Sequence, residues 1–311
     1  MSITNIDVTL RDGGYRNGFS FPAGYAVEHA RLSVEAGFDW VEIAYRNGSF
    51  NPATSQGISG LGPNAYISEM ADIIGPEHTG LILHPSNIDS TDLQECYAAG
   101  ARLVRICLPI SDPDRGLRYV SEARDRGFTV CVNFTRASRL DTRLLVELSS
   151  RSADAGANAI YLADSNGSMQ PGEVSRKVTL VREVSGIEVG FHAHNNLGLA
   201  LANSLAAAQA GAEWMDSSVL GMGKGSGNLI SEQWIAHLES HHVDPERFNL
   251  GALLDLSALL RDSVEESGPV LPHTDLILGR FDLSVEHRDR VSGDCRAQVH
   301  VARELARVAA Q

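Results

Sequence analysis

The sequence predicts a single (β/α)₈ barrel, the TIM-barrel architecture, with a small C-terminal helical extension. The chain has 311 residues, which accommodates a barrel of about 250 residues and an appendage. Short apolar, strand-like runs occur eight times, and segments with apolar residues at helical spacing separate them. Strands that alternate with helices pair in parallel, and eight such units close into a barrel.

The first strand is expected at residues 5–12, "NIDVTLRD". Each later run begins at a glycine, the residue that typically ends a helix in the left-handed conformation. These runs are 37–46, 80–85, 100–109, 127–136, 156–165, 186–195 and 211–223. An open doubly wound sheet is the alternative, but no GxGxxG motif follows the first strand.

The barrel is expected to occupy residues 1–243 and to end with a helix near 228–242. The rhythm of strands and helices then changes. Two helix-like segments, 248–267 and 294–310, lie within an extension expected at 244–311. Such a tail typically packs against the barrel or against a second subunit.

Composition limits the classes of function. With 26 basic and 39 acidic residues the net charge is −13, which disfavours nucleic-acid binding. No apolar run approaches the roughly 18 residues of a membrane span, and the N-terminus lacks a signal-peptide pattern. We therefore expect a soluble cytoplasmic protein. Cys107 and Cys131 are expected to be small buried side chains, and only Lys177 and Lys224 could form a Schiff base.

The active site of such a barrel lies at the carboxyl ends of its strands. Polar side chains that follow the predicted strands are therefore the candidate site residues. They are Arg11, Asp12, Glu42, Arg46, His84, Asn133, Asp164, Ser165, His192 and His194. His84, Asn133 and Arg46 are expected to line the substrate pocket.

The motif "GFHAHNN" places two histidines on one face of a strand, since side chains alternate across it. Val189, Phe191 and Ala193 form the apolar face that must meet the outer helices. His192 and His194 should then point into the barrel. An isolated H-x-H pattern is more often a polar strand face than a metal site, but its position at the barrel rim favours a metal.

The same alternation applied to the first strand turns Ile6, Val8 and Leu10 outward and Arg11 inward. Asp12 then leans over the rim towards the histidines. One carboxylate and two imidazoles suit a divalent ion such as Mn²⁺, Mg²⁺ or Zn²⁺.

Arg11 and Glu42 are both expected in the interior of adjacent strands. They form either a buried ion pair that joins the strands or a pair in which Glu42 orients Arg11 to stabilise an enolate. The two interpretations are compatible.

Five motifs together resemble the DRE-TIM metallolyases, also called the HMGL-like superfamily. They are "DVTLRDGG", "VEIAYR", "LADSNGSM", "GFHAHNNLGLALANS" and "GMGKGSGN", which cover residues 5 to about 235 in barrel order. The superfamily includes 4-hydroxy-2-oxoacid aldolases, hydroxymethylglutaryl-CoA lyases, and isopropylmalate and homocitrate synthases. The opening "TLRDGGYRNGFSF" is most similar to 4-hydroxy-2-oxovalerate aldolase-like members.

The resemblance implies metal ligation by Asp12, His192 and His194, and less specifically by Asn228. It also implies that Arg11 is the catalytic arginine and that Glu42 completes the Asp-Arg-Glu signature. Ser165 matches a substrate-contacting serine of the aldolases. The cofactor implied is a divalent metal, with Mn²⁺ or Mg²⁺ favoured and Zn²⁺ or Co²⁺ as alternatives.

Three departures from the family pattern affect which base and which reaction the sequence predicts. Pyruvate aldolases carry a catalytic histidine three residues after the ligand aspartate, where this chain has Tyr15. A tyrosine acts as a base only if its pKa falls well below about 10. The loop "GMGKGSGN" lacks the cysteine of the hydroxymethylglutaryl-CoA lyases, and the tail is too short for the regulatory region of the isopropylmalate-type synthases.

The leading hypothesis is a metal-dependent carbon–carbon lyase that acts on a 4-hydroxy-2-oxo acid through a pyruvate enolate. In this hypothesis either Tyr15 or a metal-bound water is the base. The alternative enzyme is one that catalyses a Claisen-type condensation of an acyl-CoA with a 2-oxo acid. A Schiff-base aldolase that uses Lys224 is a weaker hypothesis. A non-catalytic ligand-binding barrel is the alternative of another class. The expected partner is a small 2-oxo acid, and the expected assembly is a homo-oligomer, a dimer or larger.

Overall fold

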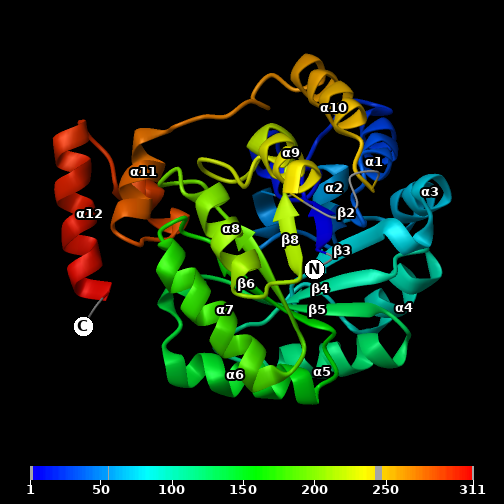
Figure 1. Ribbon diagram of the computed structural model, residues 1–311, viewed down its shortest axis with the longest axis horizontal. Coiled ribbons are helices and arrows are strands. Elements are labelled where there is room, and N and C mark those ends of the chain that lie inside the picture. The colour runs from blue at the N-terminus through cyan, green and yellow to red at the C-terminus, as the bar shows by residue number, and fades with distance from the viewer. Residues whose placement is uncertain (1–2, 55, 242–246, 310–311) are drawn as a thin grey trace.

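The computed structural model describes residues 3–54, 56–241 and 247–309, and it contains a closed barrel of eight parallel strands ringed by helices (Figure 1). Neighbouring strands follow chain order, and β8 closes the barrel against β1. The predicted fold class is therefore confirmed. The strands are β1 Thr4–Asp7, β2 Trp40–Tyr45, β3 Thr79–Leu83, β4 Leu103–Cys107, β5 Thr129–Phe134, β6 Ala159–Asp164, β7 Glu188–Ala193 and β8 Trp214–Ser217.

The helices lie between the strands and after the last one. They are α1 Tyr25–Glu35, α2 Ile58–Leu61, α3 Asn64–Ile74, α4 Ser90–Ala98, α5 Pro113–Asp125, α6 Thr142–Asp154, α7 Pro171–Ser185, α8 Ala200–Gln209, α9 Ser231–His241, α10 Leu250–Ser263, α11 His273–Arg280 and α12 Cys295–Ala309. Among the residues described, no helix has the length and apolar character needed to cross a membrane.

Side-chain alternation on β7 is as predicted. Val189, Phe191 and Ala193 belong to the large apolar core between the barrel and its helices. His192 therefore points into the barrel, and His194, one residue past the strand, shares that side. The ends of the strands thus deliver both imidazoles to the mouth.

The alternation predicted for the first strand is wrong at Ile6 and Val8. Both pack in a cluster with side chains from β4, β5, β6 and β8, which only the barrel interior brings together. Leu10 does lie in the outer core. The strand ends at Asp7, and the backbone turns so that the Asp12 N–H donates to the Val8 carbonyl at 2.7 Å. This turn, and not strand alternation, folds Arg11 and Asp12 over the barrel mouth.

A buried polar cluster ties β1 to α1. The Asp7 carboxylate accepts hydrogen bonds from the Thr9 backbone at 2.9 Å and from the Ser33 hydroxyl at 2.7 Å, and it pairs with the His29 ring at 2.5 Å. Asp7, His29 and Ser33 are completely buried. Burial alone would raise the pKa of Asp7, but His29 and Thr9 outweigh it and lower the pKa below 3.8.

The C-terminal region divides into two parts. The domain boundary expected between residues 243 and 244 lies outside the described residues. Beyond it, α10 lies beside α1 (Figure 1), and Leu253, Leu256 and Leu260 belong to the large barrel core. In contrast, α11 and α12 share a small core of their own, which includes Leu278 and Ala302.

The segment around α11 is anchored on the barrel mouth. Asp282, which has a positive φ of 52°, accepts hydrogen bonds from Ser138 at 2.7 Å, Asn166 at 2.8 Å and Ser168 at 2.7 Å. These three residues follow β5 and β6. The C-terminal segment therefore contacts the face of the barrel where the strands end.

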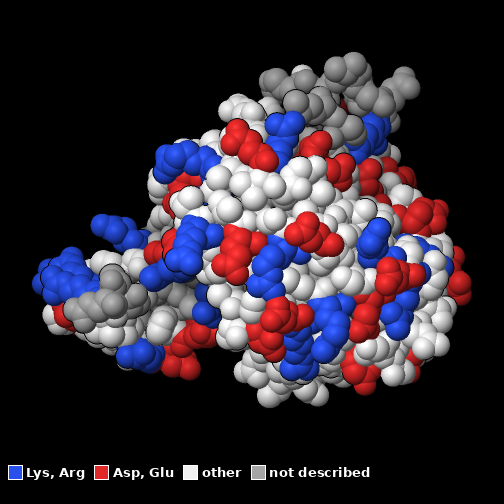
Figure 2. Space-filling view, turned by 90° about the horizontal axis from the view of Figure 1, so that it is seen from below, with Lys and Arg blue, Asp and Glu red and all other residues white. Residues whose placement is uncertain are grey.

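In the view of Figure 2, acidic and basic side chains are interspersed over the visible face. Cys107 and Cys131 are buried thiols, as expected from their strand-like surroundings.

The substitution Asp7→Asn is expected to lower the free energy of unfolding by about 3–5 kcal/mol, because it removes the charge from a buried pair. The pKa of Asp7 is lower in the folded state, so its contribution is present above its unfolded pKa and is lost as pH falls through the folded pKa. The difference in the free energy of unfolding between the wild-type protein and the variant should therefore become smaller below about pH 4. Urea unfolding at pH 7 and pH 3 measures both effects. Asp72→Asn, at an exposed position on α3, is the control; equal losses in the two variants would contradict the prediction.

Candidate metal centre and substrate cavity

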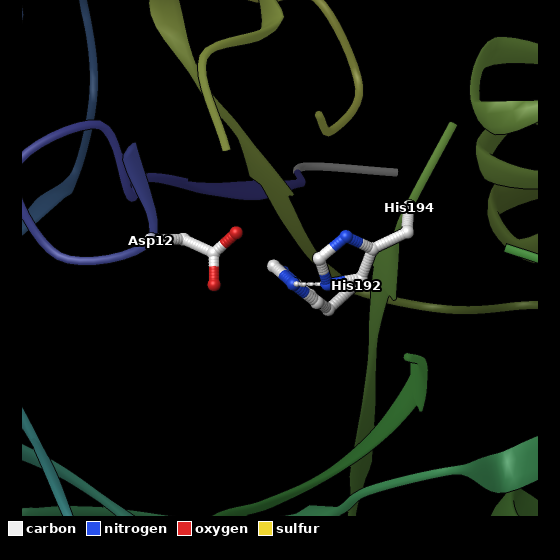
Figure 3. Close-up of side chains that lie close together, drawn as sticks. All are labelled: Asp12, His192 and His194. Atoms are coloured by element: carbon white, nitrogen blue, oxygen red, sulfur yellow. Dashed lines mark hydrogen bonds between the residues drawn. The ribbon is translucent and has the colours of Figure 1, made fainter. Parts of the chain in front are cut away.

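Three buried side chains converge at the mouth of the barrel. Ligand atoms of Asp12, His192 and His194 all lie within 4.8 Å of one another. Figure 3 shows the Asp12 carboxylate facing the two imidazoles across a small gap. The Nε2 atoms of the histidines are 3.3 Å apart. This is the donor set expected from the sequence, and its geometry suits a divalent cation.

The Asp12 carboxylate is held in its ionised form. Its Oδ1 accepts from Arg11 Nη1 at 2.7 Å, and its Oδ2 accepts from Asn228 Nδ2 at 2.9 Å. Burial alone would raise the pKa of Asp12, but Arg11 and His194 outweigh burial and lower it far below the usual range. The oxygen atoms are therefore available as anionic ligands at neutral pH.

The His194 imidazole is also in the neutral state that a metal requires. Burial lowers the pKa of His194 to about 4, so this ring is neutral at pH 7. His192 Nδ1 lies 2.8 Å from Asp216 Oδ2, and a carboxylate at that distance accepts the Nδ1 proton. This contact orients the ring so that its Nε2 atom is directed at Asp12 and His194.

Asn228 gives a further indication that a cation fits. Its side-chain oxygen is buried and has no hydrogen-bond partner among the described residues, whereas its amide nitrogen donates to Asp12. An amide oxygen is a ligand type that divalent ions accept, and the nitrogen contact places this side chain next to Asp12. Backbone pairing of Asn228 with His194 fixes the loop after β8 against the end of β7.

Beneath the ligands lies a buried network of two arginines and two carboxylates. Glu42 Oε2 accepts from Arg11 Nε at 2.8 Å, and its other oxygen lies 2.8 Å from Arg105 Nε. Arg105 also binds Asp216 through both terminal nitrogens, one at 2.8 Å. The predicted Arg11–Glu42 pair is therefore present, and it extends through Asp216 to His192.

Sequence reasoning missed Arg105, Asp216 and Tyr45. Arg105 and Asp216 were detectable, since each is a charged residue inside an apolar strand, two positions after an inward-facing side chain (Leu103 and Trp214). Such a residue can be tolerated inside a barrel only if it has a partner of opposite charge.

A cavity of about 350 Å³ adjoins the ligands and contains three of the predicted substrate residues. His84, Asn133 and Ser165 line it together with Arg11 and Tyr15. A second cavity of about 1280 Å³ lies between the barrel mouth and the C-terminal segment, and the two share Tyr15 and Lys224 in their walls. The site is therefore built from residues of both the barrel and the extension.

Arg46 does not line this cavity, contrary to expectation. Its guanidinium pairs with Asp92 at 2.8 Å and with Glu95, both on α4, outside the barrel. The strand register shifts between Glu42 and Ala44, a β-bulge that reverses the alternation. Tyr45 consequently occupies the inward position.

Tyr15 occupies the position where the resemblance leads one to expect a catalytic histidine. Its hydroxyl lies 3.3 Å from the Tyr45 hydroxyl, and the Lys224 ammonium lies 5.1 Å from the centre of its ring. Burial raises the pKa of Tyr15 above 10. The side chain is therefore a phenol at neutral pH, which donates a hydrogen bond but does not act as a base.

The substitution Asp216→Asn is expected to weaken Mn²⁺ binding about 10–100-fold, because it removes the carboxylate that orients His192. Calorimetric titration of the metal-free protein measures the affinity, and circular dichroism reports whether the variant folds. Asp289→Asn changes an exposed carboxylate in the C-terminal segment and should leave the affinity unchanged. A folded Asp216→Asn protein with wild-type affinity would contradict this role.

Comparison with known proteins places this geometry in a family. The family model described as HMGL-like matches residues 2–260. A protein of Rhodococcus opacus named 4-hydroxy-2-oxovalerate aldolase 4 is 30% identical over 277 residues, which cover 89% of this chain and 80% of that protein. A 4-hydroxy-2-oxovalerate aldolase of Carboxydothermus hydrogenoformans is 31% identical over 233 residues, 75% of this chain and 69% of that protein.

Among solved structures, the N-terminal domain of a candidate aldolase from Bacteroides vulgatus superposes with a TM-score of 0.83. The alignment covers 96% of this chain and 99% of that one at 24% identity, a likeness that supports the fold alone. The family model spans most of the chain and includes the candidate ligand residues described above. The chain therefore belongs to the HMGL-like family, the DRE-TIM metallolyases that its motifs resemble.

Proposed function

We propose that the protein cleaves the C3–C4 bond of a 4-hydroxy-2-oxo acid, releasing pyruvate and an aldehyde, and that it catalyses the reverse addition. The observation that carries the proposal is the convergence of Asp12, His192 and His194 beside the Arg11 guanidinium on one small cavity. The relatives named 4-hydroxy-2-oxovalerate aldolase support the same reaction class. The protein is accordingly a metal-dependent carbon–carbon lyase.

When bound, a divalent ion at this centre supplies a Lewis acid for the carboxylate and carbonyl oxygens of the 2-oxo acid. Arg11 stabilises the negative charge that develops on the C2 oxygen as the bond breaks. Glu42 and Asp12 fix its guanidinium through bonds of 2.8 and 2.7 Å, so no reorganisation is needed during the reaction.

Other residues of the cavity are positioned to bind the remaining polar groups of the substrate. The Asn133 side-chain oxygen is buried without a hydrogen-bond partner among the described residues and can accept from a substrate hydroxyl. Ser165 Oγ accepts from the Arg136 backbone at 2.9 Å, which leaves its proton free to donate. The Tyr15 phenol is a second donor.

Several finer features belong to the same proposal. Mn²⁺ or Mg²⁺ is the favoured ion, with Zn²⁺ or Co²⁺ as alternatives, because the donors are oxygen and imidazole nitrogen atoms without a thiolate. We also propose a cytoplasmic homo-oligomer, a dimer or larger. Exposed apolar side chains of the C-terminal region, such as Leu271 at 61% exposure, support the assembly.

Removal of the metal is expected to abolish pyruvate release from 4-hydroxy-2-oxovalerate, and added Mn²⁺ should restore it. Lactate dehydrogenase coupling to NADH oxidation measures pyruvate, with the coupling enzyme assayed alone under the same conditions as the control. Full activity after chelation would contradict the proposal. If borohydride then labelled Lys224, the chemistry would instead be that of a Schiff-base aldolase.

The substitution Arg11→Lys is expected to lower kcat about 10²–10³-fold, because a lysine cannot hold the same donor in place while bonding Glu42 and Asp12. KM should change much less, since the lost interaction forms mainly in the transition state. Steady-state kinetics measures kcat and KM separately. Arg31→Lys, on the exposed surface of α1, is the matched control; a kcat within the range of this control would contradict the role of Arg11.

A further inference from the structure

Aldol cleavage requires a group that accepts the proton of the 4-hydroxyl, and Tyr15 does not supply it. The titratable side chains that line the smaller cavity are Arg11, Asp12, Tyr15, Tyr45, His84, Cys107, Arg136, His192, His194, Lys224 and Glu286. A base must be unprotonated at neutral pH, must face the cavity, and must have a free lone pair.

Most members of this set fail one of these conditions. The Asp12, His192 and His194 side chains are ligands of the proposed metal centre. Glu286 is paired with Arg136 at 2.7 Å. Arg11 is a cation. Burial lowers the pKa of Lys224, but its nitrogen lies over the Tyr15 ring, 5.1 Å from the ring centre. Burial raises the pKa of both phenols and of the thiol, so these groups keep their protons at neutral pH.

His84 meets all three conditions. It follows β3 directly, and its ring stacks on Tyr45 with centroids 5.7 Å apart and planes 18° apart. Phe50 contacts it edge-on at 6.1 Å. No described residue forms a hydrogen bond with either of its ring nitrogens. The imidazole is thus held by aromatic contacts alone and presents a free lone pair to the cavity.

We propose that His84 is the proton-transferring residue of this reaction, a role that rests on the proposed function. Its imidazole takes the proton of the 4-hydroxyl while the C3–C4 bond breaks. The electrons of the O–H bond form the aldehyde carbonyl, and those of the C3–C4 bond form the enolate of pyruvate. The imidazolium then returns the proton to C3, so the reaction is balanced in atoms and electrons without any co-reactant.

The electrostatic surroundings agree with this role. Burial, Arg11 and Lys224 lower the pKa of His84 to about 4, so the ring is neutral before substrate binds. A substrate carboxylate placed beside Arg11 would offset one of these positive charges and strengthen the base.

Tyr45 acts as the positioning residue. Its ring contacts His84, lies 5.8 Å from the Arg11 guanidinium carbon, and carries the hydroxyl that meets Tyr15. One aromatic side chain therefore links the proposed base to the residue that stabilises the enolate.

The test compares two reactions of one variant, His84→Asn. Cleavage of 4-hydroxy-2-oxovalerate requires removal of the 4-hydroxyl proton. Decarboxylation of oxaloacetate yields the same pyruvate enolate without removal of a hydroxyl proton. The variant is expected to lose about 10²–10⁴-fold in kcat for cleavage. It should retain metal-dependent decarboxylation and wild-type Mn²⁺ affinity, and it should exchange the methyl protons of pyruvate with deuterium more slowly.

His300→Asn, at an exposed position on α12, is the matched control and should keep both reactions. Tyr45→Leu, which removes the stacking partner, should lower cleavage more than decarboxylation. Undiminished cleavage by His84→Asn, or equal loss of both reactions, would overturn the proposed role. A wild-type protein that performs neither reaction with added metal would instead refute the proposed function itself.

Discussion

The buried network of Arg11, Glu42, Arg105 and Asp216 is the interaction on which the site depends. Each arginine is shared between carboxylates, and the two positive and two negative charges cancel inside the barrel. A single uncompensated charge at such a depth would cost several kcal/mol, so the four residues are required together. The network fixes Arg11 at one end and, through Asp216, the orientation of His192 at the other. The proposed enolate-stabilising cation and the metal centre are thus parts of one electrostatic unit.

The C-terminal segment forms part of the wall of this site. Asp282 binds three side chains that follow β5 and β6, and Glu286 pairs with Arg136 beside the smaller cavity. Because Glu286 lines both cavities, the walls around the substrate come from widely separated parts of the chain. The extension is therefore a structural component of the proposed active site and not merely an appendage.

The sequence predicted the barrel and the inward direction of His192 and His194, because glycine spacing and strand alternation are local properties. Asp12 does meet these histidines and Arg11 does pair with Glu42, but a turn and not the predicted alternation of the first strand places them there. The prediction that Ile6 and Val8 face outward was wrong, since the strand ends at Asp7 and a turn carries Asp12 to the mouth. The prediction that Arg46 lines the pocket was wrong for a similar reason. A bulge in β2 reverses the alternation, and no feature of the amino-acid sequence indicates this bulge. Arg105 is a different case. Its charge was visible in the strand, but its partners come from β2 and β8 and become apparent only when the barrel closes.

The relocation of the base follows from the same geometry. All eight strands of a barrel direct their carboxyl ends to one centre, so a proton acceptor can come from a different strand without moving the metal or Arg11. In this chain the position after the first strand holds the Tyr15 phenol, while His84 after β3 reaches the same cavity. Tyr45 lies between them and contacts both side chains. A phenol that donates and an imidazole that accepts can then bind opposite ends of one substrate hydroxyl. In this proposed arrangement the tyrosine orients the group that the histidine deprotonates.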